Sequence, residues 1–159
     1  QGGQIWAESV PGQRTVFHFT LPLAQELVPV LARSRLANLK ILVVDDSPEN
    51  LVLMTRFLEK SGAIVATAPS AREALRHMEG GEMPDMVFSD IEMPDGDGYE
   101  LLRGIRQMER TAGKHIPTLA ISAHSGSSET NRILGAGFDM LISKPISLSS
   151  VLSAVDRIG

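Results

Sequence analysis

Five polar residues of this chain stand at the ends of short apolar runs, and their side chains are of kinds that bind metal ions or take part in catalysis. They are, in chain order, Asp45, Asp46, Asp90, Ser122 and Lys144. An apolar run that stops at a polar residue is typical of a buried strand that reaches the edge of its sheet. In open α/β sheets, ligands bind beyond the carboxyl ends of parallel strands. We therefore expect three carboxylates, a hydroxyl and an amine to converge on one edge.

The three carboxylates need a positive partner, because close carboxylates repel and burying them unpaired is costly. A divalent cation relieves both effects. Hard oxygen ligands that leave coordination positions open suit Mg²⁺, which keeps several waters and binds substrate phosphate. Lys144 would neutralise what the metal does not. Taken singly, Asp45-Asp46 could cap a helix, Asp90 could be a turn residue and a lysine is commonly solvated. Their joint placement predicts a shared anion and metal site.

Alternating strand and helix patterns surround these residues. Buried strands are expected over residues 40–44, 63–67, 86–89, 118–121 and 140–142. Helices are expected from Ser47-Pro48-Glu49 to Gly62 and over residues 70–79, 99–110, 128–135 and 147–157. This alternation predicts right-handed βαβ units, an α/β fold whose parallel sheet is covered by helices on both faces.

Composition excludes several classes of protein. Hydrophobic residues make up 43% and charged residues 21% of the 159 residues, and the mean hydropathy is +0.03, which excludes a disordered tail or a membrane span. A net charge of -4 argues against nucleic-acid binding, because phosphate contacts need Lys and Arg. Without cysteine there is no disulfide, thiolate zinc site or cysteine nucleophile. The opening residues 1–4 lack a signal-peptide pattern, and we expect a cytoplasmic piece of a longer protein.

Residues 39–159 resemble a response regulator receiver domain, the phosphoacceptor module of two-component signalling. Its motifs are similar to four segments of this chain, namely residues 41–46, 90–98, 121–123 and 143–145. The resemblance implies a flavodoxin-like (βα)5 fold, a doubly wound parallel sheet with strand order 2-1-3-4-5. It also implies a phosphorelay function that uses Mg²⁺.

The resemblance assigns a role to each site residue. Asp90 would be the nucleophile that accepts a phosphoryl group from phosphohistidine. Lys144 and the metal would stabilise the phosphoryl oxygens during transfer, and Ser122 would then donate its hydroxyl to one of them. The expected Mg²⁺ ligands are Asp45, partly through water, Asp46, Asp90 and the backbone carbonyl of Glu92. The Lys144-Pro145 peptide is expected to be cis, as in the family.

The N-terminal residues form a separate pattern. Two strands are expected over residues 4–10 and 14–23 around the turn 10–13, and they resemble the last strands of a histidine-kinase ATP-binding domain. We therefore expect three parts: residues 1–23 as the end of that kinase domain, 24–38 as a linker broken by Pro29, and 39–159 as the receiver. The nucleotide-binding motifs of the kinase domain are absent, so this fragment is not expected to bind ATP as a kinase.

These resemblances together suggest the C-terminal receiver of a hybrid sensor histidine kinase. A membrane anchor elsewhere in that kinase is compatible with this expectation. The fragment would catalyse only its own phosphorylation and dephosphorylation. The expected partners are the phosphohistidine domain of the kinase and a histidine phosphotransfer protein, with no nucleic-acid or membrane contact. Both partners would dock near the first helix and the site, where Met54, Phe57 and Leu58 are candidate contacts, although core packing suits most of them better.

Three positions near the site are distinctive. Leu141, three residues before Lys144, stands where the family normally has an aromatic residue, so we expect any signal to pass through aliphatic packing or loop motion. Glu92 and His124 lie two residues after Asp90 and Ser122, at positions that tune hydrolysis in the family. His124 is either a pH-sensitive modulator or a plain solvated histidine.

Three other functions compete with phosphoryl acceptance. The first is a receiver-like interaction module with little or no phosphorylation, against which the intact set of five site residues argues. The second is a hydrolase with an aspartate nucleophile in the motif 90–92, but that chemistry normally uses the first strand and a substrate-capping insert. The third is a flavin-binding version of the fold, although a flavin phosphate favours donor-rich loops over an acidic site.

Overall fold

The computed structural model describes residues 4–10, 14–20, 35–94 and 97–158, and the chain divides into two units, residues 1–31 and 32–159. In the first unit, β1 (Gln4–Val10) and β2 (Arg14–Thr20) pair as an antiparallel hairpin, with Gln4 opposite Thr20. The sequence predicts this hairpin, but its expected extension over residues 21–23 and the linker residues 24–34 lie outside the described residues.

The second unit contains a parallel sheet of five strands. Its strands are β3 (Lys40–Val44), β4 (Ile64–Ala68), β5 (Met86–Asp90), β6 (Thr118–Ser122) and β7 (Met140–Ser143). They lie in the order β4-β3-β5-β6-β7. Numbered within this unit, that is the order 2-1-3-4-5, so the predicted flavodoxin-like topology is confirmed.

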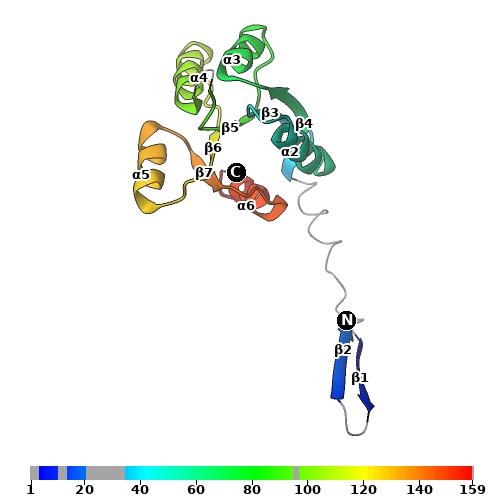
Figure 1. Ribbon diagram of the computed structural model, residues 1–159. Helices are drawn as coiled ribbons and strands as arrows, with labels where there is room; N and C mark the ends of the chain where they lie inside the picture. The colour runs from blue at the N-terminus through cyan, green and yellow to red at the C-terminus, as the bar shows by residue number, and fades with distance from the viewer. Residues whose placement is uncertain (1–3, 11–13, 21–34, 95–96, 159) are drawn as a thin grey trace. The chain divides into compact units, whose positions relative to one another are not determined.

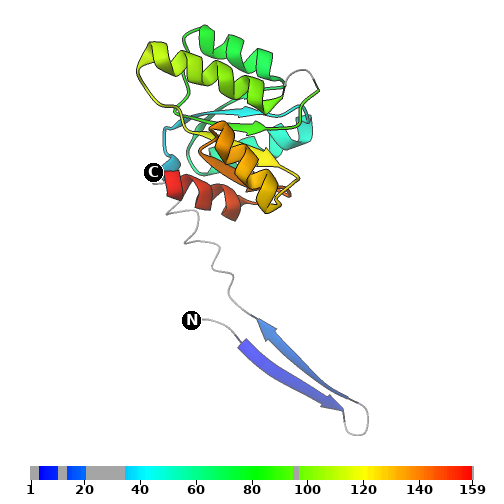
Figure 2. The same ribbon diagram turned by 90° about the vertical axis from the view of Figure 1, so that its left-hand side faces the viewer.

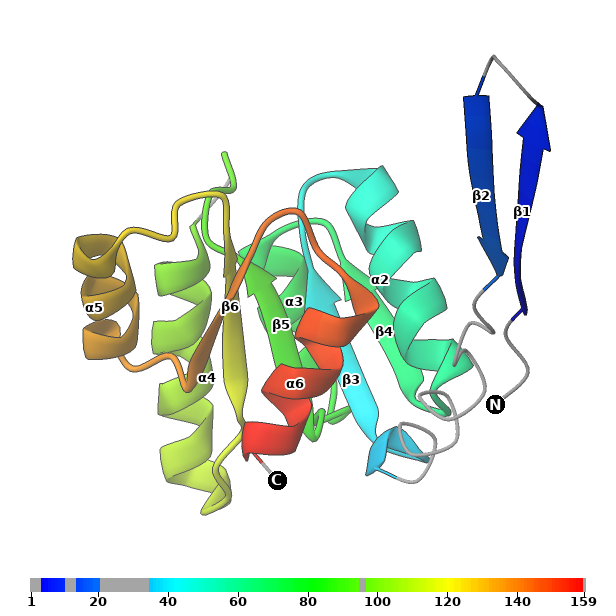
Figure 3. The same cartoon turned by 90° about the horizontal axis from the view of Figure 1, so that it is seen from below.

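Helices cover both faces of this sheet. They are α2 (Pro48–Lys60), α3 (Ala71–Glu79), α4 (Gly98–Ala112), α5 (Ser127–Ala136) and α6 (Leu148–Ile158). α2 and α6 lie on one face, and α3 and α4 lie on the other (Figures 1 and 3). α5 follows β6 and packs beside α4, where Ile133 joins Leu102 in one buried cluster (Figure 2).

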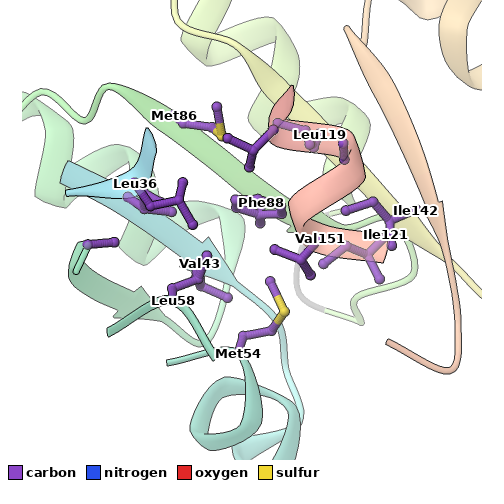
Figure 4. Close-up of a cluster of buried hydrophobic side chains, with 14 residues drawn as sticks. Leu36, Val43, Met54, Leu58, Met86, Phe88, Leu119, Ile121, Ile142 and Val151 are labelled. Carbon is purple, nitrogen blue, oxygen red and sulfur yellow. The ribbon is translucent and has the colours of Figure 1, made fainter. Parts of the chain in front are cut away.

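Alternate residues of β3 serve the two faces. Ile41 and Val43 pack in the cluster beneath α2 and α6, whereas Leu42 and Val44 pack in the cluster beneath α3 and α4. All four are at most 1% exposed, as expected for a strand buried on both faces. Phe88 of β5 lies in the middle of the first cluster, surrounded by aliphatic side chains from the strands, α2 and α6 (Figure 4).

Local capping sets where the elements begin and end. Ser47 caps α2 by accepting a hydrogen bond from the Asn50 N–H, and Pro48 follows it at the start of the helix, as the sequence predicts. β4 begins at Ile64 instead of the expected residue 63, because the Ala63 N–H still donates to the Leu58 carbonyl at the end of α2. The other helix and strand bounds of the second unit differ from the predicted ones by no more than two residues.

Candidate functional site: an acidic pocket at the strand ends

The carboxyl ends of the central strands bring the predicted site residues together. Asp45 directly follows β3, and Asp90 is the last residue of the neighbouring β5, whose Ser89 is paired with Val44. One carboxylate oxygen each from Asp45, Asp46 and Asp90 lies within 4.8 Å of the others. Asp46 is exposed, whereas Asp45 and Asp90 are buried. The three carboxylates therefore form one acidic pocket, as their positions after the apolar runs predict.

Asp45 is held in place by the start of α2. Its Oδ1 accepts a hydrogen bond from the Ser47 N–H at 2.8 Å, and the Asn50 side-chain amide donates to Oδ1 and Oδ2 at 3.3 and 3.0 Å. Burial raises the pKa of Asp45 above its ordinary 3.8, and the charge of Asp90 adds to this, although the bonds from Ser47 and Asn50 oppose it. The ionised carboxylate is thus poorly compensated by the protein alone.

The contact of Asn50 with Asp45 is not predicted from the sequence. Its only signal is its position in the first turn of the helix that follows Asp45-Asp46, which places its amide beside the carboxylate. An asparagine there could as well have been an ordinary helix residue, so the role becomes visible only in three dimensions.

Asp90 and Lys144 form an ion pair across the pocket. The Lys144 Nζ donates to Asp90 Oδ2 at 3.0 Å, and the Glu92 N–H donates to Asp90 Oδ1 at 3.1 Å. Burial works against the charge of Lys144, but the hydrogen bond and attraction from Asp90, with help from Asp45 and Asp46, raise its pKa above 10.5. The Lys144-Pro145 peptide is cis, as expected. Lys144 is therefore a firmly charged ammonium next to Asp90.

Ser122 ends β6, the strand next to β5. It is 1% exposed, and its Oγ accepts a hydrogen bond from the His124 N–H at 3.0 Å. A serine hydroxyl that accepts one bond still carries a proton that it can donate. Among the described residues, its hydroxyl makes no hydrogen bond to Asp90 or Lys144, so it stands at the same edge without belonging to the ion pair.

The start of α4 packs directly against the end of β5. A Cβ on Gly98 would lie 2.6 Å from the Asp90 carbonyl oxygen and 3.0 Å from the Ile91 Cα, so only glycine fits there. The Gly98 N–H donates to the Ile91 carbonyl at 3.0 Å, and the buried Ser89 hydroxyl donates to the Asp90 carbonyl at 2.8 Å. Both residues fix the backbone that carries Asp90, a role that the sequence analysis does not assign to them.

The surroundings of His124 and Leu141 differ from what each residue alone would predict. His124 is exposed as a solvated histidine would be, but its Nδ1 lies 2.9 Å from Glu92 Oε1, so the two residues pair at the mouth of the pocket. Leu141 packs against a buried cluster that also receives Tyr99 of α4. The Tyr99 ring meets Phe138 edge-on with centroids 5.7 Å apart. Aromatic side chains are thus present in this cluster although residue 141 is aliphatic.

The donor set fits Mg²⁺. Its oxygens come from carboxylates, one of which is exposed, so coordination positions remain open to water or phosphate. Burial and the charge of Asp90 raise the pKa of Asp45, and a cation bound at this pocket would offset both effects. The pocket therefore combines a hard-cation site, a buried carboxylate and an ammonium, which together can bind and transfer a phosphoryl group.

Comparison with known proteins defines the class of this fold and site. Residues 41–156 match the response regulator receiver domain, and the chain belongs to that family. It is a receiver domain of two-component signalling, as the motifs predict. Receiver domains of hybrid sensor histidine kinases are among its relatives, such as sensor protein EvgS of Escherichia coli (strain K12), which is 30% identical over 92% of this chain and 12% of its own length.

Other proteins and one solved structure are also similar to this chain. A 14.6 kDa protein of Leptolyngbya boryana without a described function is 36% identical over 77% of this chain and 91% of its own length. The chain spans about 15% of Probable histidine kinase 6 of Oryza sativa subsp. japonica and less of EvgS. The receiver domain of the histidine kinase CKI1 from Arabidopsis thaliana, solved with Mg²⁺ and BeF3⁻, is 32% identical with a TM-score of 0.69 over 80% of this chain and 94% of that one.

Proposed function

We propose that this receiver domain accepts a phosphoryl group on Asp90. The observation that carries the proposal is the acidic pocket itself, in which Asp90 lies within 4.8 Å of two further carboxylates and 3.0 Å from the Lys144 ammonium. A buried carboxylate beside a fixed ammonium and a cation site is the arrangement that in-line phosphoryl transfer needs. The solved relative from Arabidopsis, which carries Mg²⁺ and BeF3⁻, supports the same chemistry.

The chain's own residues would carry out the step as follows. An Asp90 carboxylate oxygen attacks the phosphorus of a phosphohistidine; the new O–P bond forms as the P–N bond breaks, and the imidazole leaves with the electron pair. Lys144 balances negative charge on the phosphoryl oxygens. Ser122 turns its free hydroxyl proton toward one of these oxygens, which gives the new group a partner at the end of β6.

Mg²⁺ would be held by Asp45, partly through water, by Asp46 and Asp90, and by the backbone carbonyl of Glu92. When bound, it supplies positive charge for the phosphoryl oxygens. Asn50 and the Ser47 N–H would keep the Asp45 carboxylate oriented for this role, because they already bond it.

The partner surface is proposed to be the exposed side of α2 beside the pocket. Met54 and Leu58 are at most 1% exposed, so these two candidate contacts belong to the core. Val52 and Leu53 are instead 52% and 38% exposed, and they offer apolar contact to a helix bundle that carries a phosphohistidine. The partners would be the phosphohistidine domain of a kinase and a histidine phosphotransfer protein.

The surrounding protein is proposed to be a hybrid sensor histidine kinase whose receiver works in the cytoplasm. The match to EvgS covers 92% of this chain, more than residues 39–159 alone provide, so it reaches into the N-terminal part. This supports residues 1–23 as the end of a kinase ATP-binding domain, 24–38 as a linker and 39–159 as the receiver. None of the helices in the described ranges is long and apolar enough to cross a membrane.

Incubation with acetyl phosphate and Mg²⁺, followed by mass spectrometry of the intact chain, tests the function. We expect a single base-labile phosphoryl adduct that is lost in EDTA and in Asp90→Asn, while the matched variant Asp85→Asn, outside the pocket, is still labelled. A chain that remains unlabelled although it is folded would support the second candidate, an interaction module that is not phosphorylated. Leu53→Asp should slow transfer from a phosphohistidine protein but leave acetyl phosphate labelling intact.

A further inference from the structure

A groove between α4 and α5 carries arginines that phosphoryl transfer at the acidic pocket does not use. The groove has a volume of about 550 Å³. Tyr99, Leu102 and Ala136 give it an apolar floor, and Arg103, Arg106 and Arg110 line it from α4. A hollow of this size with a few charged groups is typical of a binding site.

The three arginines follow the spacing of one helix face. Positions i, i+3 and i+7 lie on the same side of an α-helix, so the row runs along the groove. The outer two, Arg103 and Arg110, are seven residues apart, which corresponds to about 10 Å along the helix axis. The row therefore presents charge at two separated points.

The middle arginine, Arg106, already makes hydrogen bonds and ion pairs within the domain. Its guanidinium donates to the Ile116 carbonyl at 3.1 Å and to the Gly137 carbonyl at 2.8 Å, and it pairs with Glu109 and Asp139. Arg106 thus ties α4 to the segments that precede β6 and β7, and only its aliphatic stem remains to line the hollow.

Arg103 and Arg110 are different, because both are exposed. Among the described residues, no carboxylate lies within 4.0 Å of either guanidinium and neither donates a hydrogen bond. In a chain with a net charge of -4, two uncompensated cations on either side of an apolar floor form a distinct local surface. Guanidinium groups bind carboxylates in a two-pronged geometry, which makes acidic side chains their natural partners.

We propose that this groove docks an acidic helical segment of a partner protein, in which two carboxylates lie two turns apart and flank an apolar side chain. The carboxylates would pair with Arg103 and Arg110, and the apolar side chain would enter the hollow above Leu102 and Ala136. Two turns of a partner helix span the same distance as the two arginines. Two carboxylates spaced two turns apart match the spacing of the two arginines along α4 directly, whereas a single phosphate would need both side chains to bend toward one point, and two free cations are too few for a nucleic-acid surface.

The test uses a synthetic helical peptide with two glutamates seven residues apart and a leucine between them. Its binding to the full chain is measured by fluorescence anisotropy. We expect binding that weakens with added salt and that falls about tenfold in the double variant Arg103→Glu/Arg110→Glu. The matched control Arg72→Glu/Arg157→Glu changes the net charge equally at exposed arginines elsewhere and should bind like the unmodified chain.

Three outcomes would overturn the proposal: no binding of the glutamate peptide, equal binding by the groove variant and the control, or equal binding of a peptide with lysines in place of the glutamates. Tight, groove-dependent binding of inorganic triphosphate with no peptide binding would also overturn it, because the site would then take a small anion. Urea unfolding of the groove variant should match that of the unmodified chain, which shows that the variant is folded without relying on the proposed phosphorylation.

Discussion

Replacing Asp45 with asparagine should stabilise the metal-free protein and remove its response to Mg²⁺. Asp45 is 1% exposed, and burial raises its pKa above 3.8. Asparagine keeps an oxygen that can accept from the Ser47 N–H but carries no charge to be buried or to repel Asp90. A change that weakens a metal site is thus expected to strengthen the fold.

The pH dependence of this effect follows from the raised pKa of Asp45. Because the folded pKa lies above the unfolded value, the penalty is absent below pH 3.8, grows as the pH rises through the folded pKa and is fully present at neutral pH. Removing a buried charge that the protein compensates poorly belongs to the stabilising changes that commonly add about 0.5–2 kcal/mol, so we expect Asp45→Asn to raise the free energy of unfolding by an amount in this range. Mg²⁺ at ten times its dissociation constant should add about 1.4 kcal/mol to the unmodified chain.

Urea unfolding at neutral pH, in EDTA and in Mg²⁺, measures both effects. A matched control is Asp85→Asn, because the Lys40 N–H and the Lys114 ammonium lower the pKa of Asp85. The same chemical change should therefore destabilise the chain at position 85 and leave its Mg²⁺ response unchanged. The reasoning is refuted if Asp45→Asn is less stable than the unmodified chain in EDTA, or if it still gains stability from Mg²⁺.

Three further substitutions have defined expectations. Asp139→Ala removes the carboxylate that accepts a hydrogen bond from the Thr118 N–H at 2.8 Å. Burial works against the charge of Asp139, but the bond from Thr118, together with His115 and Arg106, lowers the pKa of Asp139 below 3.8. This substitution should cost about 1–3 kcal/mol at neutral pH in urea unfolding. This difference should fade as the pH falls through the folded pKa, and a pH-independent loss would contradict it. Gly98→Ala should force the start of α4 away from the Asp90 carbonyl. We expect this to lower the free energy of unfolding by about 1–3 kcal/mol and to slow acetyl phosphate labelling. Labelling at the rate of the unmodified chain would count against the packing argument. Phe88→Ala, fully buried, should cost about 3–5 kcal/mol, and a loss below about 1 kcal/mol would argue against a close-packed core.

The main features of the fold and the pocket could be predicted because they depend on local pattern. The continuous apolar run of residues 41–44 is typical of a strand buried on both faces, and the polar residue that ends it is then expected at the sheet edge. Asp45, Asp90 and Lys144 therefore meet, although they are far apart in sequence. The strand order follows from the family resemblance, since periodicity alone leaves several orders open.

The remaining features depend on contacts between segments that no local pattern connects. Gly98 must be glycine because α4 begins against the Asp90 carbonyl, and nothing in the residues beside it announces that approach. The pairing of His124 with Glu92 needs two loops from different strands to meet. Tyr99 reaches the cluster around Leu141 from α4, so an aromatic residue is present where inspection of position 141 alone predicts aliphatic packing.

The most direct test of the central claim is to locate the phosphoryl group chemically. After labelling with acetyl phosphate and Mg²⁺, borohydride reduction converts an aspartyl phosphate into homoserine, which peptide mass spectrometry assigns to one position. The account predicts homoserine at position 90 and none at 45 or 46, with no conversion when EDTA is present. Conversion at another residue, or a phosphoryl group on a histidine or serine with Asp90 intact, would contradict it.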